Sequence, residues 1–145
     1  MRTAFFPLSL LVLLASSTTA CTTYRDQLVR SQQAFEQNQH ERTLTLLRAL
    51  EPNTTRLSTP EQAQYAYLRG MTDYRIGYRA DARHWLSLAK TYDDASGGGG
   101  QAGLPTDWKA RMTDALGEMN GVVYSEGLEA LSGQRKPGED LKIRP

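Results

Sequence analysis

Residues 59–92 read TPEQAQYAYLRGMTDYRIGYRADARHWLSLAKTY, and they carry the clearest helix signals in the chain. Its first residues are a helix start signal, because Thr59 suits the N-cap, Pro60 the first helical position and Gln62 the end of a capping box. Apolar and small residues then recur at helical spacing until Gly77, which predicts a left-handed cap. The remainder again has helical spacing. We therefore expect an antiparallel helical hairpin.

The residues before this hairpin predict another pair of helices. Tyr24, Leu28, Ser31 and Phe35 recur at spacings of four, three and four, which places them on one stripe of a helix. After a short polar break, leucines rebuild an apolar face that ends before Pro52, where helical geometry is disfavoured. No segment shows the alternation of apolar and polar residues that is typical of strands. The sequence therefore predicts an all-α fold.

The two predicted hairpins form an internal repeat when they are laid over one another at an offset of 39 residues. Apolar and small positions then coincide along both helices. The coinciding pairs are Val29 with Leu68, Ser31 with Gly70, Phe35 with Tyr74, Asn38 with Gly77, Thr43 with Ala82, Leu47 with Leu86 and Leu50 with Ala89. The repeat predicts two similar units.

The second unit resembles a tetratricopeptide repeat. In that family a small residue lets the two helices cross tightly, a glycine closes the first helix, and the second helix carries Ala, a bulky residue and Ala. Gly70, Gly77, Ala82, Leu86 and Ala89 occupy those places. The first unit is degenerate, and the offset is five residues longer than the usual period of the family. The resemblance implies two tetratricopeptide-like hairpins over residues 21–94, with a generic helical bundle as the alternative.

The C-terminal part is predicted to cover the last repeat. Residues 95–104 are a glycine-rich linker, and residues 105–131 form an amphipathic capping helix with a possible break near Gly121. The apolar face of this helix comprises Trp108, Met112, Ala115, Met119 and Val122. Residues 132–145 lack an apolar period, so we expect a disordered tail.

The N-terminus predicts export. Residues 1–20 combine one positive charge, a short apolar stretch and a run of small residues, which is typical of a signal peptide. Thr18-Thr19-Ala20-Cys21 resembles the lipobox of bacterial lipoproteins, with Thr18 in place of the usual Leu. The resemblance implies that Cys21 receives diacylglycerol and an N-acyl chain, and Thr22 implies delivery to the outer membrane. The alternative is ordinary cleavage after Ala20, which leaves a soluble periplasmic protein.

Charge and chemistry exclude several classes of function. The chain has 17 Lys plus Arg and 16 Asp plus Glu, and removing residues 1–20 takes away Arg2, which leaves 16 of each. Without a basic cluster, nucleic-acid binding is not expected. The glycines of residues 97–103 follow a predicted helix rather than a strand, and the two histidines are not in metal-ligand spacing. We expect no enzymatic activity, no metal and no cofactor apart from the lipid.

The resemblance also implies a partner-binding groove. In tetratricopeptide proteins the first helix of each pair lines a concave surface that takes a peptide from a partner. Carried onto the second unit, the groove residues are Gln64, Tyr67, Met71, Tyr74 and Arg75. The alternative is that the two tyrosines are core residues that pack on the capping helix.

Lipoproteins of this design are pilotins or accessory subunits of envelope machines for pilus assembly, secretion, motility or outer-membrane protein assembly. The resemblance thus implies a membrane-anchored protein-interaction subunit with envelope proteins as partners and the domain facing the periplasm. Because two repeats leave an apolar face uncovered, self-association is also expected. An alternative is a lipoprotein that binds a small ligand or cell-wall fragment in a pocket between the capping helix and the second hairpin, with Trp85 and Trp108 as stacking platforms.

Overall fold

The computed structural model describes residues 23–97 and 103–134. This part of the chain contains helices and no strands, which confirms the all-α prediction. The helices are α1 (Tyr24–Glu36), α2 (His40–Leu50), α3 (Thr59–Arg75), α4 (Arg79–Ala95) and α5 (Thr106–Gln134), with a 3₁₀ helix, η1 (Glu51–Arg56), between α2 and α3.

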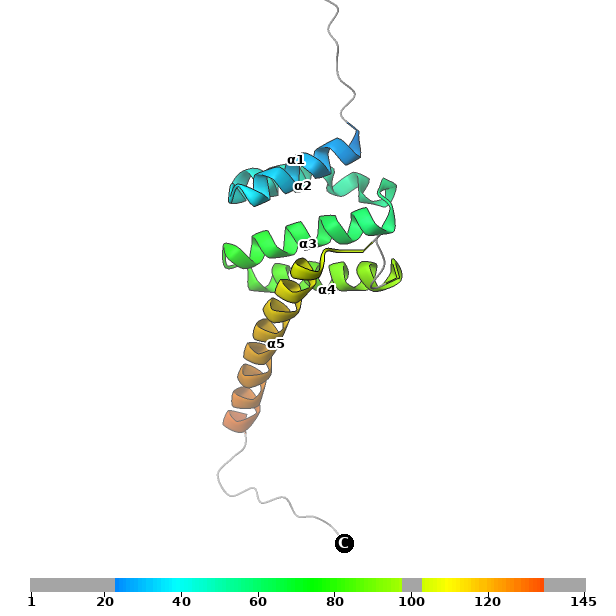
Figure 1. Ribbon diagram of the computed structural model, residues 1–145. Helices are drawn as coiled ribbons and strands as arrows, with labels where there is room; N and C mark the ends of the chain where they lie inside the picture. The colour runs from blue at the N-terminus through cyan, green and yellow to red at the C-terminus, as the bar shows by residue number, and fades with distance from the viewer. Residues whose placement is uncertain (1–22, 98–102, 135–145) are drawn as a thin grey trace, which may run out of the picture.

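The helices form two antiparallel hairpins and a fifth helix that crosses them (Figure 1). The α1–α2 hairpin lies on the α3–α4 hairpin, and these four helices form the body of the molecule. Helix α5 runs across α3 and α4 before it projects away from this body. Helix α3 is central, because it packs against each of the other four helices. All residues from Tyr65 to Asp73 are buried, as expected for a helix surrounded by others.

The same turn connects the two helices of each hairpin. Asn38 has a φ of 56° and Gly77 a φ of 92°, so both residues are left-handed. The amide of Gln39 donates to the carbonyl of Ala34 at 2.9 Å, and Tyr78, 39 residues later, makes the matching bond at 2.8 Å. Asparagine is one of the few residues other than glycine that adopt this conformation readily. The two turns thus have the same left-handed residue and the same hydrogen bond at an offset of 39 residues.

The start of α3 differs from the prediction by one residue. Ser58, with extended backbone angles, is the N-cap in place of Thr59. The Glu61 carboxylate accepts hydrogen bonds from the Ser58 amide at 2.8 Å and the Ser58 hydroxyl at 2.7 Å, so Glu61 closes the capping box. The side-chain Nε2 of Gln62 instead donates to the carbonyls of Thr54 and Leu57, each at 3.1 Å. Gln62 thus ties α3 to η1.

Helix α5 is longer than predicted. It runs without a break past Gly121, and residues 132–134, expected in the tail, belong to it. On its predicted apolar face Met112, Ala115 and Met119 are buried, but Val122 is 50% exposed because the helix has left the body by that point. The central residues of the predicted linker, 98–102, and residues 135–145 of the predicted tail lie outside the described residues.

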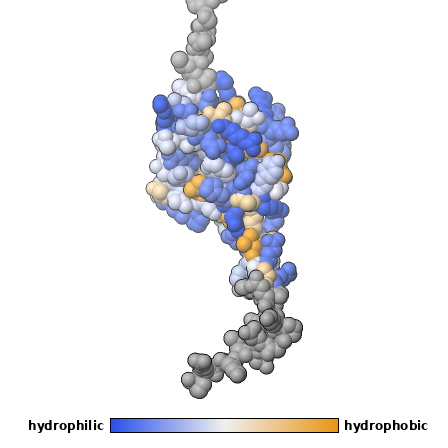
Figure 2. All heavy atoms as spheres, turned by 180° about the vertical axis from the view of Figure 1, so that it is seen from behind, coloured by the Kyte–Doolittle hydropathy of each residue, from blue (hydrophilic) through white to orange (hydrophobic). Residues whose placement is uncertain are grey.

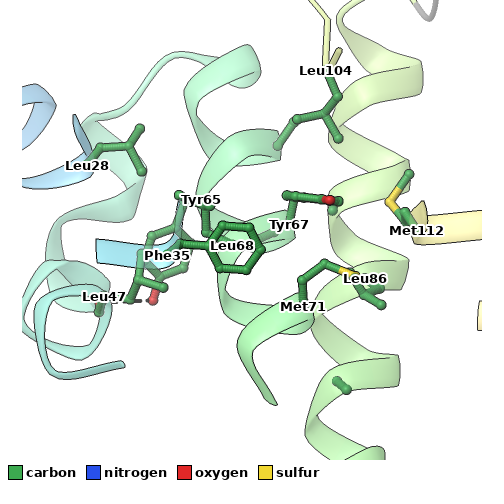
Figure 3. Close-up of a cluster of buried hydrophobic side chains, with 14 of the residues drawn as sticks. Leu28, Phe35, Leu47, Tyr65, Tyr67, Leu68, Met71, Leu86, Leu104 and Met112 are labelled. Atoms are coloured by element: carbon green, nitrogen blue, oxygen red, sulfur yellow. Dashed lines mark hydrogen bonds between the residues drawn. The ribbon is translucent and has the colours of Figure 1, made fainter. Parts of the chain in front are cut away.

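A continuous apolar core joins the hairpins and α5 (Figure 3). Leu47 and Leu86, which occupy equivalent positions in the two units, have no exposed surface, and the same holds for Leu50 and Ala89. Tyr67 points from α3 toward Met112 of α5. The core therefore depends on α5 as well as on the hairpins.

Candidate functional site

The five residues predicted for the partner groove lie on α3 and face α1 and α5. They are Gln64, Tyr67, Met71, Tyr74 and Arg75. Tyr67 and Met71 are buried, Gln64 and Tyr74 are partly buried, and Arg75 is exposed. The structure thus brings these residues together on one surface, and α5 lies across that surface.

Tyr67 is part of a cluster of three aromatic rings contributed by three helices. Its ring stacks on Trp108 of α5 with centroids 4.4 Å apart and an interplanar angle of 12°. Phe35 of α1 meets both rings edge-on, at 6.2 Å from Tyr67 and 6.4 Å from Trp108. Burial raises the pKa of the Tyr67 hydroxyl. Tyr67 is therefore a core residue under α5, and a partner cannot contact it in this arrangement.

Tyr74 fixes α5 near the point where it leaves the body. Its hydroxyl donates a hydrogen bond to the carboxylate of Glu118. The same carboxylate accepts from Arg79 at 2.9 Å, and the Arg79 guanidinium lies 4.5 Å from the centre of the Tyr74 ring. The bond to Glu118 raises the pKa of Tyr74, and the bond from Tyr74 lowers the pKa of Glu118. This cluster lies at the rim of the surface between α3 and α5, where solvent reaches it.

Gln64 and Arg75 join the two hairpins at opposite ends of the predicted groove. Gln64 donates to the side chain of Gln32 on α1 at 2.7 Å. Arg75 donates to Asn38 at 3.3 Å, and its guanidinium lies 4.2 Å from the centre of the Phe35 ring. Each predicted groove residue that reaches the rim thus already has a partner within the chain.

A buried ion pair between Arg69 and Asp73 occupies another side of α3. Arg69 is 8% exposed and Asp73 is 1% exposed, and the Arg69 Nε lies 3.0 Å from the Asp73 Oδ2. Glu51 approaches the same guanidinium at 3.6 Å, and the ring of Trp85 lies 5.6 Å away. Burial raises the pKa of Asp73 in spite of the adjacent Arg69. The signal in the sequence was the spacing of the two opposite charges at i,i+4 on α3.

Tyr65 lies beside this ion pair. The environment of its hydroxyl determines how the free energy of unfolding changes with pH in the alkaline range. Its hydroxyl donates to the carbonyl of Leu47 at 3.2 Å, and burial raises its pKa to about 12. Because a tyrosine in the unfolded chain titrates near ~10, the stability that this proton provides is complete below about pH 10 and is lost as the pH rises toward 12.

Tyr65→Phe should therefore flatten the fall in stability between about pH 10 and 12, and should cost about 1 kcal/mol at neutral pH through the lost hydrogen bond. Urea unfolding at a series of pH values measures both effects. Tyr78→Phe, on an exposed tyrosine, is the matched control. The prediction would be contradicted if the free energy of unfolding fell equally steeply with pH in wild type and in Tyr65→Phe.

The two tryptophans considered for a ligand pocket lie on different sides of α3. Trp85 packs edge-on against Tyr65 at 5.6 Å, whereas Trp108 stacks on Tyr67. Tyr65 and Tyr67 are two residues apart on a helix, so their side chains diverge by about 200°. A cleft of about 230 Å³ lies beside Trp108, with Gln32 and Gln64 in its wall, and is below the usual size of ligand pockets.

A larger cleft, of about 460 Å³, separates the start of α4 from the outer half of α5. Its lining residues are Arg79, Ala80, Arg83, Glu118, Met119, Val122, Val123 and Glu126. Outside the cleft α5 also carries the exposed apolar residues Tyr124 and Leu128, and hydrophobic surface is visible along the projecting helix in Figure 2.

The described residues place limits on the chemistry of the site. They contain no group of three His, Cys, Asp or Glu side chains arranged to hold a metal ion. Within the same ranges, no helix has both the length and the apolar character needed to cross a bilayer. Cys21, the predicted lipidation site, lies outside the described residues. No protein family, no curated protein and no solved structure matches this chain.

Proposed function

We propose that this chain is a membrane-anchored protein-interaction subunit built on two tetratricopeptide-like hairpins. The observation that supports this most directly is the repeated turn, in which Asn38 and Gly77 share a left-handed conformation and the same hydrogen bonds at an offset of 39 residues. Repeats of this kind stack on their neighbours and present extended surfaces to partners.

The exposed end of the stack supports an interaction role. Leu68 of α3 is fully buried, whereas Val29, its equivalent in α1, is 50% exposed. The difference arises because the first hairpin covers α3, and no hairpin of the described chain covers α1. Since α5 occupies the surface of Tyr67 and Met71, a partner would use this open end or the projecting part of α5.

The position of Cys21 supports an anchor at the α1 end. Only Thr22 separates it from Thr23, the N-cap of α1. Because an extended chain spans at most about 3.6 Å per residue, a lipid on Cys21 would hold the start of α1 within about 10 Å of the membrane. The outer end of α5 lies at the opposite end of the molecule (Figure 1). An anchored domain would thus direct α5 away from the lipid.

Palmitate labelling in a Gram-negative host tests the anchor. We expect wild type to be labelled and to sediment with outer membranes, and Cys21→Ala to be unlabelled, because that cysteine is the only one in the chain. Three acyl chains would hold the protein in the membrane, because each buried CH₂ contributes about 0.8 kcal/mol to binding. An unlabelled wild type would contradict the anchor.

Photo-crosslinking in the same cells tests the interaction separately. A crosslinking residue at Val29 samples the open end of the stack, and one at Ser87, on the exposed side of α4, is the matched control. We expect one defined envelope protein to be captured from Val29 and not from Ser87. If the protein is labelled but captures nothing from Val29, the anchor proposal stands and the open end of the stack is not the contact surface.

A further inference from the structure

The side of α5 that faces away from the body carries a second regular pattern. Its residues recur at spacings of four, three, four, three and four, and all of them are exposed. They are Ala110, Asp114, Gly117, Gly121, Tyr124 and Leu128. The buried stripe of Met112, Ala115 and Met119 lies on the other side of the helix. The outward pattern is therefore not explained by packing within the chain.

The outer half of α5 has little to stabilise it within one molecule. Every residue from 120 to 130 is exposed. Gly121 and Gly127 each cost about 1 kcal/mol relative to alanine in a helix, and isolated helices shorter than about 12 residues are marginal in water. Tyr124 is 70% exposed and Leu128 50%. A helix of this kind gains stability if another helix covers its apolar side chains.

We propose that the outward face of α5 pairs with the same face of a second copy in antiparallel orientation. When the pairing is centred between residues 122 and 123, Gly121 of one copy faces Tyr124 of the other, and Gly117 faces Leu128. Each bulky side chain then meets a position without a side chain. A Cβ built at Gly117 or Gly121 meets nothing within 4 Å, so the space is open. The helix thus carries both the knobs and the holes of one interface.

The rest of the molecule permits this arrangement. Because the body contacts the opposite side of α5, the two bodies lie on the outer sides of the helix pair, at opposite ends. The acidic residues nearest the centre, Glu118 and Glu126, line the cleft on the body side, and Glu118 is bonded to Tyr74 and Arg79. No like charges therefore meet at the middle of the pairing, which is two-fold symmetric.

The size of the contact indicates a weak dimer. Antiparallel overlap from residue 111 to residue 134 spans about 36 Å at 1.5 Å per residue. Two helices over that length bury on the order of 1,000 Å² in total, at the low end for specific interfaces. We therefore expect a weak dimer that forms only at high protein concentration. The inference needs no lipid anchor and no envelope partner, so it is independent of the proposed function.

Sedimentation of the full chain in mild detergent over a concentration series tests the pairing. Tyr124→Glu places a charge in the centre of the interface, whereas Val123→Glu, one residue away, places it on the body side. We expect wild type and Val123→Glu to dimerise alike and Tyr124→Glu to dimerise at least tenfold more weakly. A wild type that stays monomeric up to several hundred micromolar, or equal association of all three proteins, would overturn the proposal.

Disulfide trapping tests the orientation in a Cys21→Ser background, which removes the native thiol. Protein carrying Gly117→Cys is mixed with protein carrying Leu128→Cys and oxidised. Antiparallel pairing predicts that the mixed disulfide forms faster than either disulfide between identical copies. Preference for disulfides between identical copies would overturn the antiparallel pairing.

Discussion

Tyr67→Ala is expected to lower the free energy of unfolding by about 3–5 kcal/mol, whereas Tyr74→Ala should lower it by no more than about 1.5 kcal/mol. The two tyrosines are seven residues apart on the same face of α3. Tyr67 has no exposed surface and stacks on Trp108, so its removal leaves a cavity that three helices enclose. Tyr74 lies at the rim, and its removal deletes contacts with Arg79 and Glu118 that water can replace.

Urea unfolding followed by circular dichroism measures both changes, and Tyr67→Phe is the conservative control. It keeps the ring stacked on Trp108, so we expect it within about 1 kcal/mol of wild type. The comparison also decides between the two roles considered for Tyr67. Equal stability of the two alanine variants would show that Tyr67 does not hold α5 and is open to a partner.

Much of the fold could be predicted from local sequence signals, because those signals act within one or two turns. Gly77 ends α3 in a left-handed turn as expected, and the repeat places Asn38 in the same turn. The helix start at Ser58 was missed by one residue, because Thr59 and Ser58 are both good caps and only the backbone angles distinguish them. Errors of this size are typical where adjacent residues can serve the same purpose.

The position of α5 could not be predicted in the same way. Its spacing identified Met112, Ala115 and Met119 as the buried face but not the surface that they cover. A glycine-rich connection leaves the direction of the following helix open, so contacts such as Trp108 on Tyr67 are decided by tertiary packing. The expected groove consequently included Tyr67, which stacks on Trp108 of α5 as in the alternative that the sequence left open.

The burial of Arg69 and Asp73 was likewise beyond the reach of local signals. Charged side chains usually lie on solvated faces, and α3 is surrounded on all sides only because α1, α2, α4 and α5 converge on it. The pair lies at the boundary between the hairpins, where Glu51 from η1 and Trp85 from α4 also meet Arg69. Only the complete packing arrangement identifies it.

Gly70→Ala is expected to lower the free energy of unfolding by about 1–3 kcal/mol, although alanine favours a helix over glycine by about 1 kcal/mol. A Cβ at Gly70 would lie 2.7 Å from the Cγ of Leu86, 2.8 Å from its Cδ2 and 2.9 Å from its backbone nitrogen. The side-chain atoms could rotate away, but the backbone nitrogen belongs to α4. The two helices would therefore have to separate.

Gly117→Ala is the matched control, because a Cβ at Gly117 of α5 meets nothing within 4 Å. The same substitution there should raise monomer stability by about 1 kcal/mol, so the two variants should shift the urea midpoint in opposite directions. In a Leu86→Ala background, Gly70→Ala should lower the free energy of unfolding by less than it does in wild type, because the clashes with the Leu86 side chain are gone. It should still be destabilising, because the contact with the backbone nitrogen remains. A stabilising Gly70→Ala would show that α3 and α4 are not in close contact at Gly70.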